Sequence, residues 1–268
     1  MTESPPSYEG VHVLVAEDSP VQAQALRISL EAKGFRVDLA VHGAEALEMA
    51  RAEPPAVVIS DVEMPEMDGF QATSAIRTRE SETEEHIPIV AMTAHAMKGD
   101  RERCLEAGMD EYIPKPIRAR QVYEMIDLIT AGKMPDVPAP APVEVEEPAP
   151  VNVADDSPPL IWEDALEGVG GKEETLRELA ALLLEEIPRL LEEMRQSMAD
   201  GNAEELRRAA HTLKGSARLF AAHPTADAAQ NLETIGREEH LADADDALSR
   251  LQTEVDLLVD HIRNVILA

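Results

Sequence analysis

The proline-rich segment 133–159 constrains the fold most, because it divides the chain into two parts that must each bury a core of their own. Eight of its 27 residues are Pro, six are acidic and one is Lys. Proline opposes both helices and sheet ladders, and like charges repel one another. We therefore expect an extended, disordered linker between a first domain over 9–131 and a second over 160–268.

The charge of the chain narrows the partners that it can bind. Its 268 residues include 24 basic and 53 acidic ones, a net charge of −29. Nucleic acid and anionic membranes both require a basic surface, so neither is expected as a partner. The first ten residues lack the pattern of a signal peptide, and no apolar run approaches the roughly 20 residues of a membrane helix. With the single Cys104 excluding an internal disulfide, we expect a cytoplasmic protein.

The first domain alternates short apolar runs with helical patterns. Strands are predicted at 11–16, 36–40, 57–60, 87–92 and 111–113, and helices at 21–33, 44–53, 70–79, 98–107 and 118–130. Five strand–helix units of this length predict an α/β fold, a parallel sheet covered by helices on both faces.

The second domain is helical throughout. Helices are predicted at 172–199, with a possible kink at Pro188, and at about 203–222, 225–237 and 242–265. Asn202 is placed to cap the second of these, with Glu205 at the capping-box position. Short connections favour antiparallel neighbours, which predicts a four-helix bundle.

Polar residues gather where the predicted strands end. Glu17 and Asp18 follow the first strand, Asp61 the third, Thr93 the fourth and Lys115 the fifth. Neighbouring carboxylates repel unless a cation lies among them, and oxygen ligands with an open side suit Mg²⁺. A carboxylate can itself attack phosphorus when a metal and a Lys neutralise the transferring group. The alternative, ordinary polar loop ends, explains one such residue better than five.

The predicted helix 203–222 carries a histidine on its polar face. His211 lies about 140° from the apolar stripe at 100° per residue, so we expect it to be exposed. The same face carries Arg207, Arg208, Lys214 and Arg218, and Gly215 lies one turn beyond the histidine. An imidazole among cations is suited to carrying a phosphoryl group, and a glycine admits the close approach of another protein. An ordinary solvated helix face is the alternative.

The first domain resembles the receiver domain of two-component response regulators over about residues 9–131. The resemblance rests on the segments Val13–Asp18, Asp61–Gly69, Met92–Ala94 and Tyr112–Pro116. It implies a flavodoxin-like fold with Asp61 as the phosphoacceptor. It also implies that Mg²⁺ is held by Glu17, Asp18, Asp61 and the backbone carbonyl of Glu63.

The same resemblance implies roles for the residues that surround the acceptor. Thr93 and Lys115 would be the switch and phosphate-contacting residues, and Tyr112 the aromatic residue that reorients on activation. Ala94 would leave access to Asp61, and Lys115–Pro116 would be a cis peptide.

The second domain resembles a histidine phosphotransfer domain over about residues 160–268. His211, Lys214, Gly215 and Ser216 match the motif His-x-x-Lys-Gly-Ser. The match implies His211 as the phosphorylated imidazole and Lys214 as the phosphate partner. The chain departs from the family at Ala221, where many relatives have Gly.

Together the two resemblances imply a phosphorelay intermediate of the kind found in hybrid sensor kinases. A sensor kinase would phosphorylate Asp61, which would pass the group to His211 and onward to a downstream response regulator. The sequence leaves open the reverse flow, with Asp61 as a sink for His211, and a switch without internal transfer. Since no nucleotide-binding motif occurs, we expect a signalling phosphotransfer protein, with the ATP chemistry supplied by a separate kinase.

Overall fold

The computed structural model describes residues 8–83, 85–93, 98–115, 117, 119–130, 158–169 and 171–267. The predictions made for Ala94, for Pro116 and for residues 133–157 of the linker therefore lie outside the described residues.

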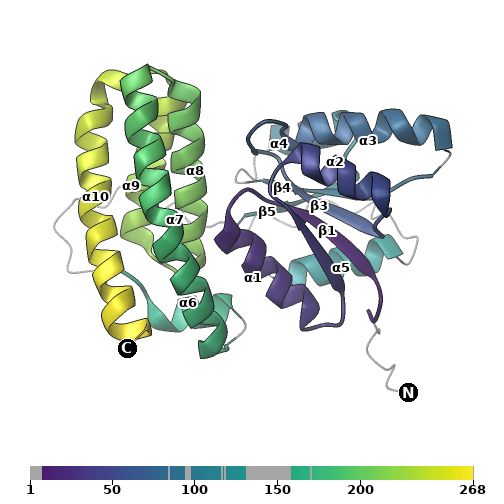
Figure 1. Cartoon of the computed structure of the whole chain (residues 1–268), viewed down its shortest axis with the longest axis horizontal. Helices are drawn as coiled ribbons and strands as arrows, with labels where there is room; N and C mark the ends of the chain where they lie inside the picture. The colour runs from purple at the N-terminus through teal and green to yellow at the C-terminus, as the bar shows by residue number, and fades with distance from the viewer. Residues whose placement is uncertain are drawn as a thin grey trace.

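The first domain is a parallel sheet between two helical layers (Figure 1). The strands are β1 His12–Ala16, β2 Arg36–Ala40, β3 Val57–Asp61, β4 Ile89–Thr93 and β5 Glu111–Pro114. The helices are α1 Pro20–Glu31, α2 Gly43–Ala52, α3 Gly69–Thr83, α4 Lys98–Glu106 and α5 Ala119–Thr130. The strand order β2-β1-β3-β4-β5 is the flavodoxin-like order, which confirms the predicted fold.

Two apolar clusters cover the two faces of this sheet. One joins α1 and α5 to the sheet through side chains such as Leu30 and Ile126, and the other joins α2, α3 and α4 through Leu47, Ile76 and Cys104. Because both faces are buried, β3 and β4 are buried along their whole lengths. The strands consequently read as continuous apolar runs that end abruptly in polar residues.

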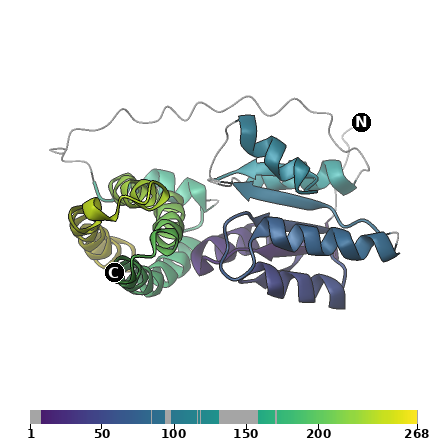
Figure 2. The ribbon, with the colours of Figure 1, turned by 90° about the horizontal axis from the view of Figure 1, so that it is seen from above.

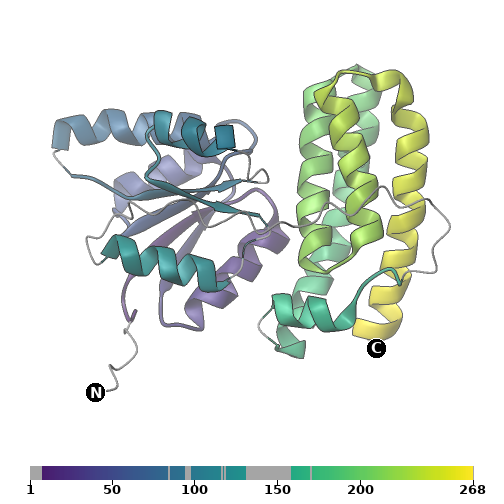
Figure 3. The same cartoon turned by 180° about the vertical axis from the view of Figure 1, so that it is seen from behind.

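The second domain is an antiparallel helical bundle, seen end-on in Figure 2 and from behind in Figure 3. Its helices are α6 Trp162–Gly168, α7 Glu173–Asp200, α8 Ala203–Leu219, α9 His223–Arg237 and α10 Ala244–His261, with short helical turns at Leu241–Asp243 and Ile262–Ile266. The short α6 was not predicted. Helix α7 continues through Pro188, and the side chain of Asn202 caps α8 as predicted.

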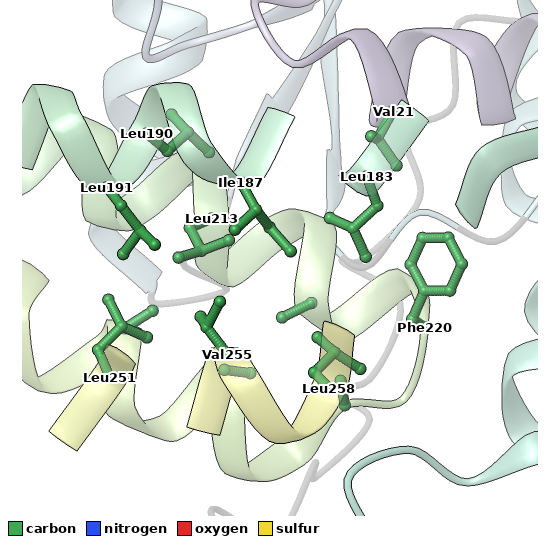
Figure 4. Packing of buried hydrophobic residues seen from close by; sticks show 14 of the residues in the cluster. Val21, Leu183, Ile187, Leu190, Leu191, Leu213, Phe220, Leu251, Val255 and Leu258 are labelled. Carbon is green, nitrogen blue, oxygen red and sulfur yellow. The ribbon is translucent and has the colours of Figure 1, made fainter. Parts of the chain in front are cut away.

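The two domains share an apolar contact. Helix α1 lies between the sheet and the bundle, where it packs against α7 and α8 (Figure 1). Val21 of α1 is fully buried and belongs to the same apolar cluster as Leu183 and Ile187 of α7, as Figure 4 shows. The partly buried Ala25 and Ile28 extend this contact along α1. The contact brings the end of the sheet that carries the predicted acidic residues against the histidine helix.

Among the described residues, no helix combines the length and the apolar character needed to cross a membrane.

Candidate functional site

Three carboxylates meet at the carboxyl edge of the sheet. Asp61 is the last residue of β3, and Glu17 and Asp18 follow the neighbouring β1 directly. Because parallel strands end at the same edge, the sequence pattern brings these side chains together. One oxygen from each of the three lies within 4.8 Å of the others. The predicted acidic pocket is therefore present.

Lys115 closes this pocket from the other side. Its Nζ lies 2.7 Å from Asp61 Oδ2 and 2.8 Å from Glu17 Oε2, with all three side chains buried. Burial by itself lowers the pKa of Lys115, but the charges of Asp61 and Glu17 outweigh it and raise that pKa. Lys115 therefore stays charged and supplies a fixed positive charge beside the Asp61 carboxylate.

One lysine does not balance three carboxylates. Burial raises the pKa of Glu17 to about 8, although Lys115 opposes the shift and Asp61 and Asp18 add to it. Burial, together with the charge of Asp61, also raises the pKa of Asp18 to about 6. An oxygen-only donor set with excess negative charge fits a hard divalent cation, so Mg²⁺ suits the residues present.

The other predicted receiver residues lie on β4, on β5 and in the turn after β3. The backbone amide of Glu63 donates to Asp61 Oδ1 at 3.2 Å. Thr93 ends β4 next to β3 and is 8% exposed, and Tyr112 is buried on β5. Gly69 begins α3 where an added Cβ would lie 2.3 Å from the Asp61 carbonyl oxygen, so only glycine fits this turn. The β3–α3 turn is thereby fixed against the acceptor.

His211 is buried, which contradicts the predicted exposure. It is only 4% exposed, since the docked receiver lies on one side of it and α9 on the other. The helix angle correctly placed it off the apolar stripe, but an angle does not reveal a second domain. Its Nδ1 lies 2.9 Å from Glu233 Oε1 and 3.6 Å from Glu63 Oε2 of the receiver. Because a carboxylate only accepts, Nδ1 carries the hydrogen, and the neutral form of this ring has its lone pair on Nε2.

Lys214 is likewise buried rather than exposed, at 2%. Its Nζ forms an ion pair with Glu233 Oε2 and a 3.2 Å hydrogen bond with Gln230 of α9. Burial lowers the pKa of Lys214, and Glu233 partly restores it. Glu233 thus binds both His211 and Lys214, and this pairing explains how a lysine is tolerated inside the bundle.

Arg207 and Gly215 of the histidine helix contact the receiver, whereas Arg218 makes no hydrogen bond or ion pair with the described residues of the receiver. Arg207 Nη1 lies 2.5 Å from Glu63 Oε2, and the charge of Arg208 offsets a small part of the rise in the pKa of Asp18. Arg218 acts within the bundle, where its charge lowers the pKa of Lys214. Gly215 faces Gln22 of α1, whose Nε2 would lie 2.6 Å from an added Cβ. The glycine therefore admits the receiver at close range.

Sequence reasoning missed the buried acids of the bundle. Glu233 is 1% exposed and Glu186 of α7 is 3% exposed. Both interrupt apolar stripes at helical spacing, Glu186 between Leu183 and Leu190 and Glu233 beside Leu232. A carboxylate on a buried stripe requires a partner, and this was the available signal.

Comparison with known proteins identifies both domains. The family model for the response regulator receiver domain matches residues 13–127, and that for the Hpt domain matches residues 178–261. The chain is 32% identical over 263 residues to the sensor protein GacS of Pseudomonas syringae pv. syringae, a match that covers 95% of this chain and 28% of GacS. It is 30% identical over 204 residues to the histidine-protein kinase BarA of Shigella flexneri, covering 76% of this chain and 22% of BarA. The chain thus spans less than a third of either relative.

Solved receiver structures are also similar to the first domain. The receiver domain of a sensor histidine kinase from Pseudomonas aeruginosa, solved with a magnesium ion coordinated in its active site cleft, is 34% identical and has a TM-score of 0.42. The match covers 46% of this chain and 98% of that one. By its two family matches, the chain belongs to the two-component signalling families, with a response regulator receiver domain over residues 13–127 and an Hpt domain over residues 178–261.

Proposed function

We propose that the chain is a phosphorelay intermediate in which Asp61 accepts a phosphoryl group and exchanges it with His211. One observation carries this proposal: the histidine helix is docked on the acidic pocket, with Thr212 Oγ1 3.4 Å from Asp18 Oδ2 and Arg207 paired with Glu63. A bundle that served only as a spacer would have no reason to bury its histidine at this edge of the sheet.

The residues present divide the chemistry between them. Lys115 and the Glu63 amide hold the two Asp61 oxygens, which orients the carboxylate for phosphorylation. On transfer, the Nε2 lone pair of His211 forms the N–P bond while the P–O bond to Asp61 breaks, and the bonding electrons return to the Asp61 carboxylate. Glu233 holds the Nδ1 hydrogen and stabilises the positive charge that develops on the ring.

Glu17, Asp18 and Asp61, with the Glu63 carbonyl as the fourth predicted ligand, would hold Mg²⁺. The ion would neutralise charge on the transferring phosphoryl group. Thr93 and Tyr112 are proposed as the residues that respond to phosphorylation of Asp61. Lys214 is proposed to contact the phosphoryl group carried by His211.

The proposed partners are a sensor histidine kinase upstream and the receiver domain of another response regulator downstream. We favour flow from Asp61 to His211. Flow from His211 to Asp61 uses the same contacts, so the docked geometry supports exchange in either direction.

The test is to label the chain with acetyl phosphate and Mg²⁺ and to separate the two phosphorylated species chemically. Hydroxylamine removes an acyl phosphate on Asp61, whereas phosphohistidine survives alkali. Wild type should acquire both, His211→Ala only the first, and Asp61→Asn neither. Lys115→Ala should also lose transfer, because the fixed positive charge beside Asp61 Oδ2 is then missing.

Asp68→Asn is the matched control, since Asp68 is a carboxylate of the same turn that lies outside the acidic pocket and only caps α3. It should label like wild type. Alkali-stable phosphate that appears normally in Asp61→Asn would falsify transfer through Asp61.

A further inference from the structure

A buried carboxylate bridges the two domains. Ser19 Oγ of the receiver donates to Glu186 Oε1 at 2.8 Å, and Ser216 Oγ of α8 donates to Glu186 Oε2 at 2.7 Å. Glu186 is 3% exposed and both serines are fully buried. An ionised carboxylate only accepts hydrogen bonds, so one hydroxyl donor from each domain matches its two oxygens.

The Glu186 bridge connects the loop that carries the acidic pair to the helix that carries His211. Ser19 directly follows Asp18, its amide lies 3.3 Å from Glu17 Oε1, and its hydroxyl also caps α1 by accepting from the Gln22 amide. Ser216 lies in the same helix as His211, five residues further on. A displacement at Glu186 therefore moves the acidic loop relative to the histidine helix.

The bridge depends on a hydroxyl that only the receiver supplies. Burial raises the pKa of Glu186 above its usual value, and the hydrogen bonds from Ser216 and Ser19 offset only part of this rise. A receiver without a hydroxyl at this place would cover Glu186 and leave one of its oxygens without a donor. A buried acceptor without a hydrogen-bond donor destabilises the docked state, particularly when the acceptor is charged.

We propose that Glu186 is a specificity-determining, positioning residue of the domain contact. It selects receivers that carry a hydroxyl group directly after the acidic pair, first of all the receiver of its own chain, and sets the register between Asp61 and His211. The selection of a transfer partner rests on the proposed function, whereas the docking that Glu186 stabilises does not.

Docking is measured without any phosphate by modification of imidazoles with diethyl pyrocarbonate, mapped by peptide mass spectrometry on the full chain. His211 is protected at 4% exposure, and His240, whose side chain is 71% exposed, serves as the internal reference. Glu186→Ala and Ser19→Ala should each raise His211 modification about 10-fold relative to His240, as expected for loss of a hydrogen bond to a charged group.

The matched controls separate the bridge from general effects. Glu185→Ala removes an exposed carboxylate next to Glu186 on α7 and should leave His211 protected. In the double variant of Glu186 and Ser19, modification should rise little beyond that of Ser19→Ala, because this variant already removes both contacts of the receiver hydroxyl with the bundle, to Glu186 Oε1 and, at 3.1 Å, to Ser216 Oγ. Glu186→Gln can accept from one hydroxyl and donate to the other, so it should stay within about twofold of wild type.

Selection of the receiver is tested with full chains in trans. His211→Ala chains, labelled on Asp61, serve as donors to an Asp61→Asn chain. Donors with Ser19 should transfer phosphate about 10-fold faster than donors that also carry Ser19→Ala.

Unchanged protection of His211 in both alanine variants overturns the proposal. The proposal is also overturned if Glu185→Ala raises His211 modification as much as Glu186→Ala does, or if Glu186→Gln raises it that much. Strictly additive effects of the two substitutions in the double variant would overturn it as well. Because Ser19 lies in the other domain, a folding defect of Glu186→Ala leaves Ser19→Ala as the deciding variant. The two assays can also disagree. If His211 protection responds to the substitutions as expected but wild type places no phosphate on His211, the proposed function is refuted and the docking role of Glu186 stands.

Discussion

Ala221 occupies a backbone position that suits glycine. Its φ is +50°, and the bonds Ala222 N to Ala217 O and Ala221 N to Arg218 O close α8 with the Schellman pattern. The left-handed conformation costs a residue with a side chain about 1–2 kcal/mol. This is the physical reason for the expectation of Gly at this position.

Replacing Ala221 by Gly should therefore stabilise the bundle by about 0.5–1 kcal/mol, measured by urea denaturation with circular dichroism. Ala222→Gly is the matched control: Ala222 has a φ of −86° and is fully buried, so glycine there should destabilise. If the two substitutions change the free energy of unfolding equally, the strain at Ala221 is not real.

A second prediction at the residue scale concerns Glu233. Burial raises its pKa, but His211 and Lys214 outweigh burial and lower it from 4.5 to about 2. A lowered pKa stabilises the folded bundle fully above about pH 4.5, and this stabilisation is lost as the pH falls toward 2. It amounts to about 3 kcal/mol at neutral pH.

Glu233→Gln should consequently lower the free energy of unfolding at pH 7, and its deficit relative to wild type should shrink between about pH 4.5 and 2. Denaturation in urea over this pH range measures the deficit. The exposed Glu205, changed to Gln, should alter stability by less than about 0.5 kcal/mol. A deficit that is independent of pH would contradict the account of Glu233.

At the scale of elements, Gly215 decides how closely α8 approaches α1. An added Cβ would lie 2.6 Å from Nε2 of Gln22, the movable end of a flexible side chain. Gly215→Ala should therefore permit docking and stabilise α8 by about 0.5–1 kcal/mol. Gly215→Leu should leave the helix intact but exclude the receiver, so that His211 becomes reactive toward diethyl pyrocarbonate. Protected His211 in the leucine variant would show that the approach is not tight.

The sequence was sufficient to predict those elements whose residue pattern is local. The strands are short apolar runs with polar ends, so the meeting of Asp61 with Glu17 and Lys115 followed from parallel topology. Helix α6 is too short for a periodic signal, whereas the apolar periodicity of α7 predicted one helix on both sides of Pro188, as the structure has it. The burial of His211 and Lys214 could not be predicted from one helix, because it arises from α9 and from a domain distant in sequence.

At the scale of the whole molecule, the tether should hold the domains at roughly millimolar effective concentration. Cleavage within 133–157 should therefore make transfer between Asp61 and His211 depend on protein concentration, whereas the intact chain should transfer at a constant rate. A protease site inserted in this segment and timed phosphate transfer at several dilutions provide the measurement. Identical rates for cut and intact protein at micromolar concentration would show that the tether is irrelevant.

Salt should slow transfer, and more so in the cut protein. The Arg207–Glu63 pair is only partly buried, with side chains 19% and 25% exposed, so ions screen part of its attraction. The apolar contact of Val21 does not weaken with salt and holds the domains together in the intact chain. Equal salt dependence before and after cleavage would indicate that the charges do not guide docking.

The burial of His211 under the chain's own receiver has a consequence for timing. In the proposed relay, a single imidazole covered by one domain is closed to every other, so reception and delivery cannot overlap and must alternate. The lifetime of the docked state then sets the shortest interval between two successive deliveries, however abundant the recipient. A chain built in this way limits the frequency of its output by the strength of an internal contact.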